Sequence, residues 1–293
     1  AATAVTASAA TAAPSAAAVA ASAAAVAASF AGAPVVARMV GAGALVARGP
    51  DAGPFLHGQL ANDVTGLPTG RATRSLLLNH RGHAMAEAVV ARDQHEWLVV
   101  VEDGMTDWVE ATLAEHIIFD DVTLSRATAA TVTVQGAGAL AALKGAMPSA
   151  VLDQPYDAGP LKGAAFWRGV HPGSGLGVIV YPRRRSAAGG YDLTLLAADD
   201  AAATLEAAAL SLVAGFVAAG ALEVTAAAID AARVAAGVTT AGRDGGAGVL
   251  PQEADLTEAL SYRKGCYLGQ EVMARIESDG VTRSGTQVFR LIT

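Results

Sequence analysis

The chain has 293 residues, of which 53% are hydrophobic and 16% are charged, and its formal net charge is −7. This length suits two or three modest domains with a buried core, although much of the apolar count is alanine. The negative charge argues against strong non-specific binding to the nucleic-acid backbone, which needs clustered Lys and Arg. A single cysteine cannot close an intrachain disulfide and fits a reducing compartment, so we expect a cytoplasmic protein.

Residues 1–37 carry no charged side chain and consist almost entirely of Ala, Ser, Thr and Val. Such a segment has too little bulky apolar area to fold alone, which predicts low-complexity, disordered chain or a leader. A secretory signal would open with Lys or Arg, and none is present. A transit peptide would be rich in Arg, which is missing, but the Ser and Ala content fits one. A mitochondrial or plastid matrix location is therefore the alternative.

Two stretches of similar order follow, at 38–135 and 136–260, each with short strands and packing helices. In the first we predict strands at 44–48, 74–79, 85–91, 97–101, 120–124 and 131–135, with helices at 53–60 and 106–118. In the second we predict strands at 164–169, 176–181 and 191–196, with helices at 136–147, 199–220 and 226–237. This order indicates an α+β fold of two mixed α/β modules, each a hairpin plus helices.

Three local patterns predict ordinary structure. The apolar run at 207–222 is shorter than a membrane span and contains Ser and Gly, so we expect a buried helix and no membrane. The three arginines at 183–185 predict a solvated loop rather than an RNA-binding patch. His80 and His83 have an H-x-x-H spacing, but with one cysteine in the chain a closed Cys/His metal site is not expected.

The most distinctive segment is K-G-C-Y-L-G-Q-E at 264–271, which holds the only cysteine, Cys266. A lone cysteine is commonly a small buried hydrophobe. Here the cations Arg263 and Lys264 favour a thiolate, and a helix beginning near 270 would add its N-terminal amides to that field. The neighbours therefore favour a reactive thiol, with two glycines that let the backbone turn tightly.

This octet resembles the K-G-C-[YF]-x-G-Q-E signature of the YgfZ-type folate-binding proteins, which are related to the glycine-cleavage T-protein. Four more segments resemble that family's F-L-x-G-Q-x-x-N-D-V, L-L-x-N-x-x-G, R-[IV]-x-A-G and L-P-Q-E-A stretches, in the same order, at 55–64, 76–82, 233–237 and 250–254. The resemblance implies a T-protein-like fold with a C-terminal β-barrel. Only 27 residues follow Cys266, so we expect 261–293 to hold the cysteine loop and the start of a largely missing barrel, with 288–293 as its first strand.

The resemblance also implies a function. It predicts a folate-binding accessory protein that supports iron–sulfur cluster assembly or repair and, indirectly, tRNA modification. Its cofactor would be tetrahydrofolate or a derivative, and its partners iron–sulfur client or assembly proteins. Cys266 would act as a thiolate tuned by Lys264. The folate site would be formed by Asn62, Asp63, Arg233, Gln252, Glu253, Tyr267, Gln270 and Glu271.

Ordinary structural roles compete with several of these assignments. An arginine fork suits a folate carboxylate, but Arg233 can equally pair with Asp230 at three-residue spacing on a helix. Asn62 and Asp63 follow a predicted helix, where such residues often cap turns.

The alternative function is a folate-dependent aminomethyltransferase of the T-protein type. Where those enzymes carry adjacent acidic residues after the N-x-x-G turn, this chain has Ala86 and Glu87. Alanine cannot accept a proton, and a shift of one residue along a strand points Glu87 to the opposite face. We therefore expect an accessory factor rather than this enzyme. A third hypothesis is a scaffold that keeps the fold without binding a ligand.

Overall fold

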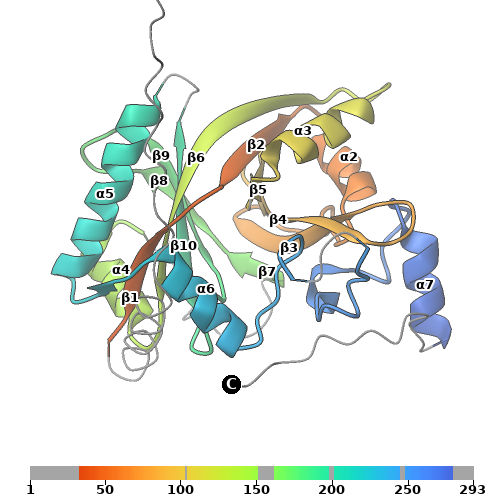
Figure 1. Ribbon diagram of the computed structural model, residues 1–293. Coiled ribbons are helices and arrows are strands. Elements are labelled where there is room, and N and C mark those ends of the chain that lie inside the picture. Colours follow the sequence, from red (N-terminus) through yellow and green to blue (C-terminus); the bar gives the residue numbers. More distant parts are fainter. Residues whose placement is uncertain (1–32, 103, 151–161, 198–200, 245–247, 280–293) are drawn as a thin grey trace, which may run out of the picture.

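The computed structural model describes residues 33–102, 104–150, 162–197, 201–244 and 248–279 (Figure 1). The strands within these residues are β1 (Val35–Met39), β2 (Gly43–Arg48), β3 (Arg71–Leu78), β4 (Ala84–Arg92), β5 (Trp97–Val101), β6 (Thr123–Gln135), β7 (Lys162–Ala165), β8 (Trp167–Val170), β9 (Gly177–Pro182), β10 (Gly190–Ala197) and β11 (Leu222–Glu223). The helices are α2 (Ala52–Gln59), α3 (Thr106–Glu115), α4 (Ala139–Ala146), α5 (Ala202–Ala218), α6 (Ala226–Ala235), the 3₁₀ turn η1 (Thr257–Ala259) and α7 (Gln270–Asp279).

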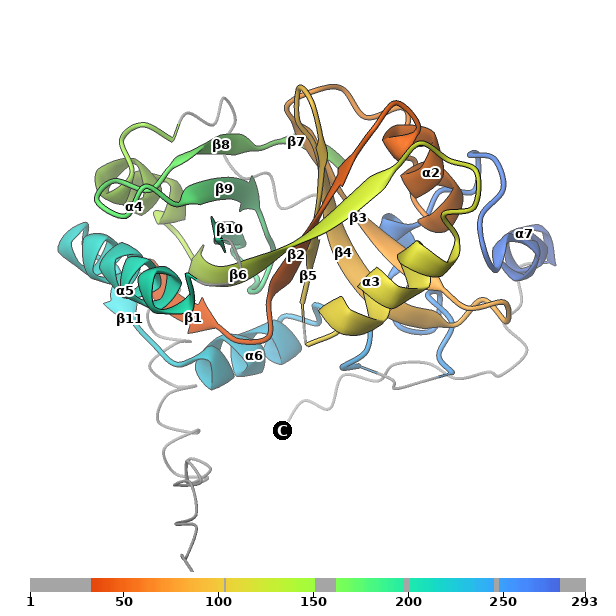
Figure 2. The same ribbon diagram turned by 90° about the horizontal axis from the view of Figure 1, so that it is seen from above.

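All strands of the described residues belong to one sheet, in the order β7-β3-β4-β5-β2-β6-β10-β9-β8, with β1 also paired to β6 and β11. Strand β6 joins its two parts. The N-terminal part of β6 pairs with β2, and its C-terminal part pairs with β10 and β1 (Figure 2). We call β7, β3, β4, β5 and β2 the first half-sheet, and β1, β10, β9 and β8 the second. The two strands predicted at 120–124 and 131–135 are thus one continuous strand of 13 residues.

The sheet is nearly closed on its other side as well. Strand β7 pairs with β3 of the first half-sheet, and β8 pairs with β9 of the second. Only Phe166 separates β7 from β8, so these short strands lead the chain across from one half-sheet to the other. Because β6 and β7–β8 connect the half-sheets on both sides, each half-sheet has an inner face and an outer face.

Helices cover the outer faces. The first outer core packs Leu45 of β2 with residues of α2 and α3, including Leu56 and Leu113. The second packs Leu193 of β10 with residues of α4 and α5, including Phe216. The predicted buried helix is therefore confirmed as α5, and no helix in the described part of the chain is both long and apolar enough to cross a membrane.

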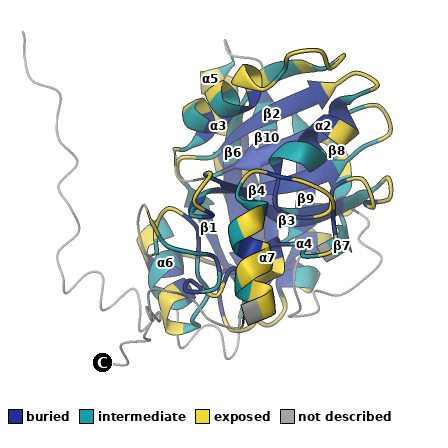
Figure 3. Ribbon diagram, turned by 90° about the vertical axis from the view of Figure 1, so that its right-hand side faces the viewer, coloured by how far each residue is buried: buried dark blue, intermediate teal, exposed yellow. Residues whose placement is uncertain are grey.

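The inner faces form a third core between the half-sheets. Leu98 and Val100 of β5 contribute to it, whereas Trp97 and Val99 belong to the outer core under α2 and α3. Strand β5 is therefore apolar on both faces, which explains its uninterrupted apolar sequence. Tyr181 of β9 adds its ring from the opposite half-sheet. Figure 3 shows the strands of the sheet mostly in the colour of buried residues.

The C-terminal segment packs against the hairpin end of β3 and β4. Residues of η1, the motif loop and α7 form a separate apolar cluster with Leu76, Leu78 and Ala84. The helix predicted to begin near residue 270 is confirmed as α7. Strand β1 begins at Val35, inside the segment predicted as low complexity, and the other residues of that segment up to 32 lie outside the described residues, as do 288–293. The predicted border at residue 135 falls at the end of β6, which both half-sheets share.

Candidate functional site

The motif loop at 264–271 presents its cysteine to solvent. Cys266 is exposed, as is Gly265 before it, so the thiol is not a core filler. The flanking residues Lys264 and Tyr267 are both buried. The loop therefore has an accessible centre held between two buried side chains.

The Lys264 ammonium points to the end of helix α2. Its Nζ donates hydrogen bonds to the backbone oxygens of His57 and Leu60 and lies 4.7 Å from the centroid of the Tyr267 ring. Burial lowers the pKa of Lys264 to about 8, against the opposing effect of the Asp63 carboxylate. The predicted influence of Lys264 on the thiolate stays a prediction, because the contacts of this ammonium are with α2 and with Tyr267.

Two glycines let the motif loop approach the β3–β4 turn. Gly82 and Gly269 have positive φ angles of 78° and 82°. A Cβ on Gly269 would lie 2.6 Å from the backbone oxygen of Asn79, and one on Gly82 would lie 2.8 Å from Cε of Met273. The contact with the Asn79 backbone is closer than a real Cβ allows, so the packing requires glycine at 269. At Gly82 the terminal methyl of Met273 can shift, and the positive φ is what favours glycine.

Asn62 and Asp63 shape the turn that follows α2. Asn62 is buried, and its Nδ2 donates to the backbone oxygen of Arg74 at 2.7 Å. The exposed Asp63 accepts a hydrogen bond from the Gly66 amide at 3.0 Å, so it caps this turn. Both residues have the structural roles considered above, and their place in a folate site stays a proposal.

Three residues of the C-terminal segment each carry a buried oxygen without a hydrogen-bond partner among the described residues: Gln252 Oε1, Glu253 Oε1 and Tyr267 Oη. The other oxygen of Glu253 accepts from the Leu250 amide at 2.9 Å, and Gln252 Nε2 donates to Tyr262 Oη at 3.0 Å. Leaving a buried acceptor unpaired costs about 1–3 kcal/mol. The chemistry of these acceptors fits the N–H donors on the aminopyrimidine edge of a pterin.

Gln270 and Glu271 begin helix α7. The Gln270 amide donates to the backbone oxygen of Tyr267 at 3.2 Å, which closes the motif loop. Glu271 is exposed in the first turn, where a negative charge interacts favourably with the helix dipole.

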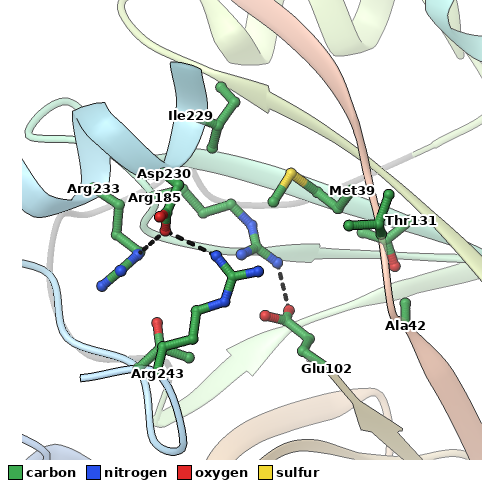
Figure 4. Close-up of a pocket in the computed structure, with 11 residues that line it drawn as sticks. Met39, Ala42, Glu102, Thr131, Arg185, Ile229, Asp230, Arg233 and Arg243 are labelled. Atoms are coloured by element: carbon green, nitrogen blue, oxygen red, sulfur yellow. Dashed lines mark hydrogen bonds and ion pairs between the residues drawn. The ribbon is translucent and has the colours of Figure 1, made fainter. Parts of the chain in front are cut away.

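A small pocket lies at the mouth of the space between the half-sheets, beside α6. Figure 4 shows its lining, which is Met39, Val40, Ala42, Glu102, Thr131, Arg185, Ile229, Asp230, Arg233, Thr240 and Arg243. Its cavity volume is about 20 Å³, room for about one water molecule. Among the residues predicted to bind folate, Arg233 is the one that lines it.

The side chain of Arg233 is held by carboxylates. Its Nε lies 2.8 Å from Asp230 Oδ1, which confirms the predicted pairing on the helix, and its Nη1 contacts Asp244. Arg243 contacts the same Asp230 oxygen at 3.0 Å (Figure 4). A folate carboxylate would therefore have to compete with these acids for the guanidinium.

A charged cluster that the sequence did not predict lies between the half-sheets. Its six members are all largely buried and combine three arginines with three carboxylates: Arg74, Glu87, Glu102, Arg183, Arg185 and Asp192. The predicted solvated loop at 183–185 is therefore wrong for Arg183 and Arg185, and only Arg184 is exposed. The reason is long-range: the carboxylates that neutralise these arginines come from strands β4 and β10 and from the end of β5.

Glu87 is the member that bears on the alternative function. Its carboxylate accepts from Arg74 Nε at 2.6 Å and Arg74 Nη2 at 2.7 Å, and Arg183 Nη1 lies 2.7 Å away. Burial raises the pKa of Glu87, but the guanidiniums of Arg183 and Arg74 outweigh burial and hold this pKa far below its usual range. Ala86 faces the other way, into the outer core. Neither residue therefore offers a carboxyl that exchanges protons near neutral pH.

The fold brings together four of the five segments that resemble the folate-binding family. Lys264 contacts His57 in the 55–64 segment, Gly269 packs on the 76–82 turn, and Ala254 of the 250–254 segment shares an apolar cluster with Tyr267. Arg233 in the fifth segment contacts the connection from α6 through Asp244. In the described part of the chain, no group of three His, Cys, Asp or Glu residues could hold a metal ion.

Comparison with known proteins gives one family match and one close structural likeness. The model of the GCVT N-terminal domain family matches residues 18–156. The structure of glycine cleavage system aminomethyltransferase T from Bartonella henselae superposes with a TM-score of 0.66 at 18% identity, over 84% of this chain and 63% of that one. The chain therefore has the same fold as this aminomethyltransferase over most of its length. It spans 63% of the length of that aminomethyltransferase.

Other comparisons add little. Heterotetrameric sarcosine oxidase from Corynebacterium sp. U-96, in complex with pyrrole 2-carboxylate, aligns with a TM-score of 0.38 at 15% identity, over 65% of this chain and 87% of that one. A score this low carries no argument about the fold. No curated protein sequence matches the chain. The predicted T-protein-like fold is thus confirmed, and its division into two modules and the YgfZ-type subgroup stay predictions.

Proposed function

We propose that this chain is a T-protein-like folate-binding protein whose chemistry is carried by an exposed thiol rather than by a catalytic carboxyl. In this role it is an accessory factor for iron–sulfur cluster assembly or repair, with an indirect effect on tRNA modification. The observation that carries the proposal is the exposed Cys266 on a loop whose flanking side chains, Lys264 and Tyr267, are buried. One cysteine cannot hold a cluster alone, so a bound cluster takes its other ligands from a partner protein or a small thiol.

The proposed cofactor is tetrahydrofolate or a derivative, which supplies a nitrogen that carries one-carbon units. Glu253 and Gln252 would accept hydrogen bonds from its pterin, because each has a buried oxygen that lacks a donor within the described chain. Tyr267 would add a neutral hydroxyl, since burial raises its pKa to about 12. Asn62, Asp63, Arg233, Gln270 and Glu271 would complete the site. The pocket that Arg233 lines holds about one water, so a folate group could enter it only if side chains there move.

The second candidate, aminomethyl transfer, is favoured by the likeness to an aminomethyltransferase fold. The state of Glu87 counts against it. Its carboxylate is ionised, buried and shared between Arg74 and Arg183, so it is a poor general base and its charge is already neutralised. Ala86, its neighbour in the position of the acidic pair, has no polar group.

The test of the proposal is genetic rescue. A strain that lacks its own homologue is complemented with the wild-type chain or with Cys266→Ala, and the activity of cluster-dependent enzymes is measured. We expect rescue by the wild type and at least a tenfold weaker rescue by the variant at equal protein level, on the order of the effect of losing a nucleophile. Equal rescue by both chains would remove the thiol from the mechanism.

A second assay separates the two candidates. The purified wild-type chain is incubated with tetrahydrofolate and an aminomethyl or formaldehyde donor, and formation of the one-carbon folate is followed. We expect no turnover above the reaction without protein. Clear turnover would favour the transferase and defeat the accessory role.

A further inference from the structure

The side chain of Lys264 attaches the loop that displays Cys266 to a distant part of the fold. Lys264 lies two residues before the cysteine, and 8% of its surface is exposed. Its Nζ donates to the backbone oxygens of His57 and Leu60, residues about 200 positions earlier in the chain. The same Nζ lies over the ring of Tyr267, the residue that follows the cysteine. One ammonium therefore contacts both α2 and the far side of the motif loop.

The carbonyls that accept from Lys264 lie at the C-terminal end of helix α2, where backbone carbonyls lack N–H donors within the helix. The last carbonyls of an α-helix have no partner within the helix and are often satisfied by a C-terminal glycine turn. Helix α2 ends at Gln59, and Leu60 after it is extended with φ of −99° and ψ of 144°. Lys264 supplies the missing donors from another segment, and even as a neutral amine it keeps two N–H groups for these two carbonyls.

We propose that Lys264 is a positioning residue that fastens the Cys266 loop to the C-terminal end of helix α2. The inference deepens the proposed function and rests on it for its biological meaning, since the thiol matters only if the loop is the working part. The geometry assigns the ammonium to the loop's anchorage instead of to the sulfur. The Gly269 contact with the β3–β4 turn secures the other end of the loop.

The ionisable groups around Lys264 give the anchorage a pH signature. His57 of α2, Asp63 of the following turn and Tyr267 of the loop itself face the ammonium. Burial lowers the pKa of Lys264 to about 8, whereas a lysine in water has a pKa of about 10.4. When the loop opens, the amine of Lys264 is exposed to water again. At a pH between these two pKa values, the exposed amine takes up a proton. The closed loop is therefore favoured as the pH rises from about 8 towards 10.

The first experiment compares amide hydrogen exchange in wild type, Lys264→Met, Lys264→Arg and the matched control Arg263→Gln, which removes an exposed neighbouring cation. We expect Lys264→Met to lower protection about tenfold or more in two segments together, the loop at 261–271 and the α2 end at 57–64, because the hydrogen bonds to His57 and Leu60 are lost. Lys264→Arg restores part of it, and Arg263→Gln leaves it unchanged. Unchanged protection in Lys264→Met, or an effect confined to the loop, would overturn the proposal.

The second experiment needs only the wild-type chain, so it holds even if a variant fails to fold. After correction for intrinsic exchange, loop protection is expected to rise about tenfold or more between pH 7.5 and 9.5. A flat profile would contradict the anchorage. Neither experiment involves folate, clusters or activity, so failure here leaves the rescue experiment with Cys266→Ala intact, and failure there leaves this result intact.

Discussion

The carboxylates of the charged cluster between the half-sheets differ in their hydrogen bonding from the buried carboxylate of the C-terminal segment. In the cluster, both oxygens of Glu87, Glu102 and Asp192 contact arginines. In the C-terminal segment, Glu253 is equally buried but leaves one oxygen without a donor in the described chain. A carboxylate whose hydrogen bonds are complete serves the architecture, whereas one whose hydrogen bonds are incomplete leaves room for a ligand. The sequence does not distinguish these two kinds of buried acidic residue, but their hydrogen bonds in the structure do.

The largest expected effect comes from breaking the cluster. Glu87→Ala leaves Arg74 and Arg183 without the carboxylate that neutralises them, and removing one partner from a buried ion pair costs about 3–5 kcal/mol. Urea denaturation followed by circular dichroism measures the loss. The control is Arg38→Ala, which removes an exposed pair with Glu206 and is expected to cost less than about 1 kcal/mol. Similar stabilities for the two variants would show that the cluster does not hold the half-sheets together.

Lowering the pH should weaken the same cluster, with a loss of stability that is smaller than in Glu87→Ala and increases gradually. The pKa values of Glu87 and Glu102 are lowered in the folded state, where burial is outweighed by Arg183 together with Arg74 or Arg185. A lowered carboxyl pKa contributes stability above the unfolded value of about 4.3, and that contribution is lost as the pH falls below it. The stability difference between wild type and Glu87→Gln should therefore be constant from pH 7 to about 5 and shrink between pH 4 and 2. A difference that stays constant to pH 2 would contradict this assignment.

The sequence predicts local structure well wherever the pattern is local. The helix at α2, the strand β5 and the start of α7 lie close to the predicted positions, because periodicity and turn residues determine them over a few positions. The Arg233–Asp230 pair was predicted for the same reason, because its two residues lie within one helical turn. The continuity of β6 was missed because its pairing with β2 and β10 comes from distant segments.

In the candidate site, too, features set by local sequence could be predicted and contacts between distant segments could not. The motif identified Cys266 and the glycines. The structure shows that Gly82 and Gly269 lie where the motif loop packs closely on the β3–β4 turn. The role of Lys264 could not be predicted, since its partners lie in α2. Arg183 and Arg185 looked solvated because the acids that bury them are not near in sequence. Contacts between distant segments therefore decide which charged residues are structural.

The central claim is that the incomplete acid, Glu253, marks a folate site. Calorimetric titration of tetrahydrofolate into the folded wild-type chain, Glu253→Gln and the exposed control Glu258→Gln tests it most directly. The account predicts binding to wild type and to Glu258→Gln with equal affinity, and about tenfold or more weaker binding to Glu253→Gln, because an amide replaces a charged acceptor. No binding heat with a folded wild type, or equal affinity in all three chains, would contradict it.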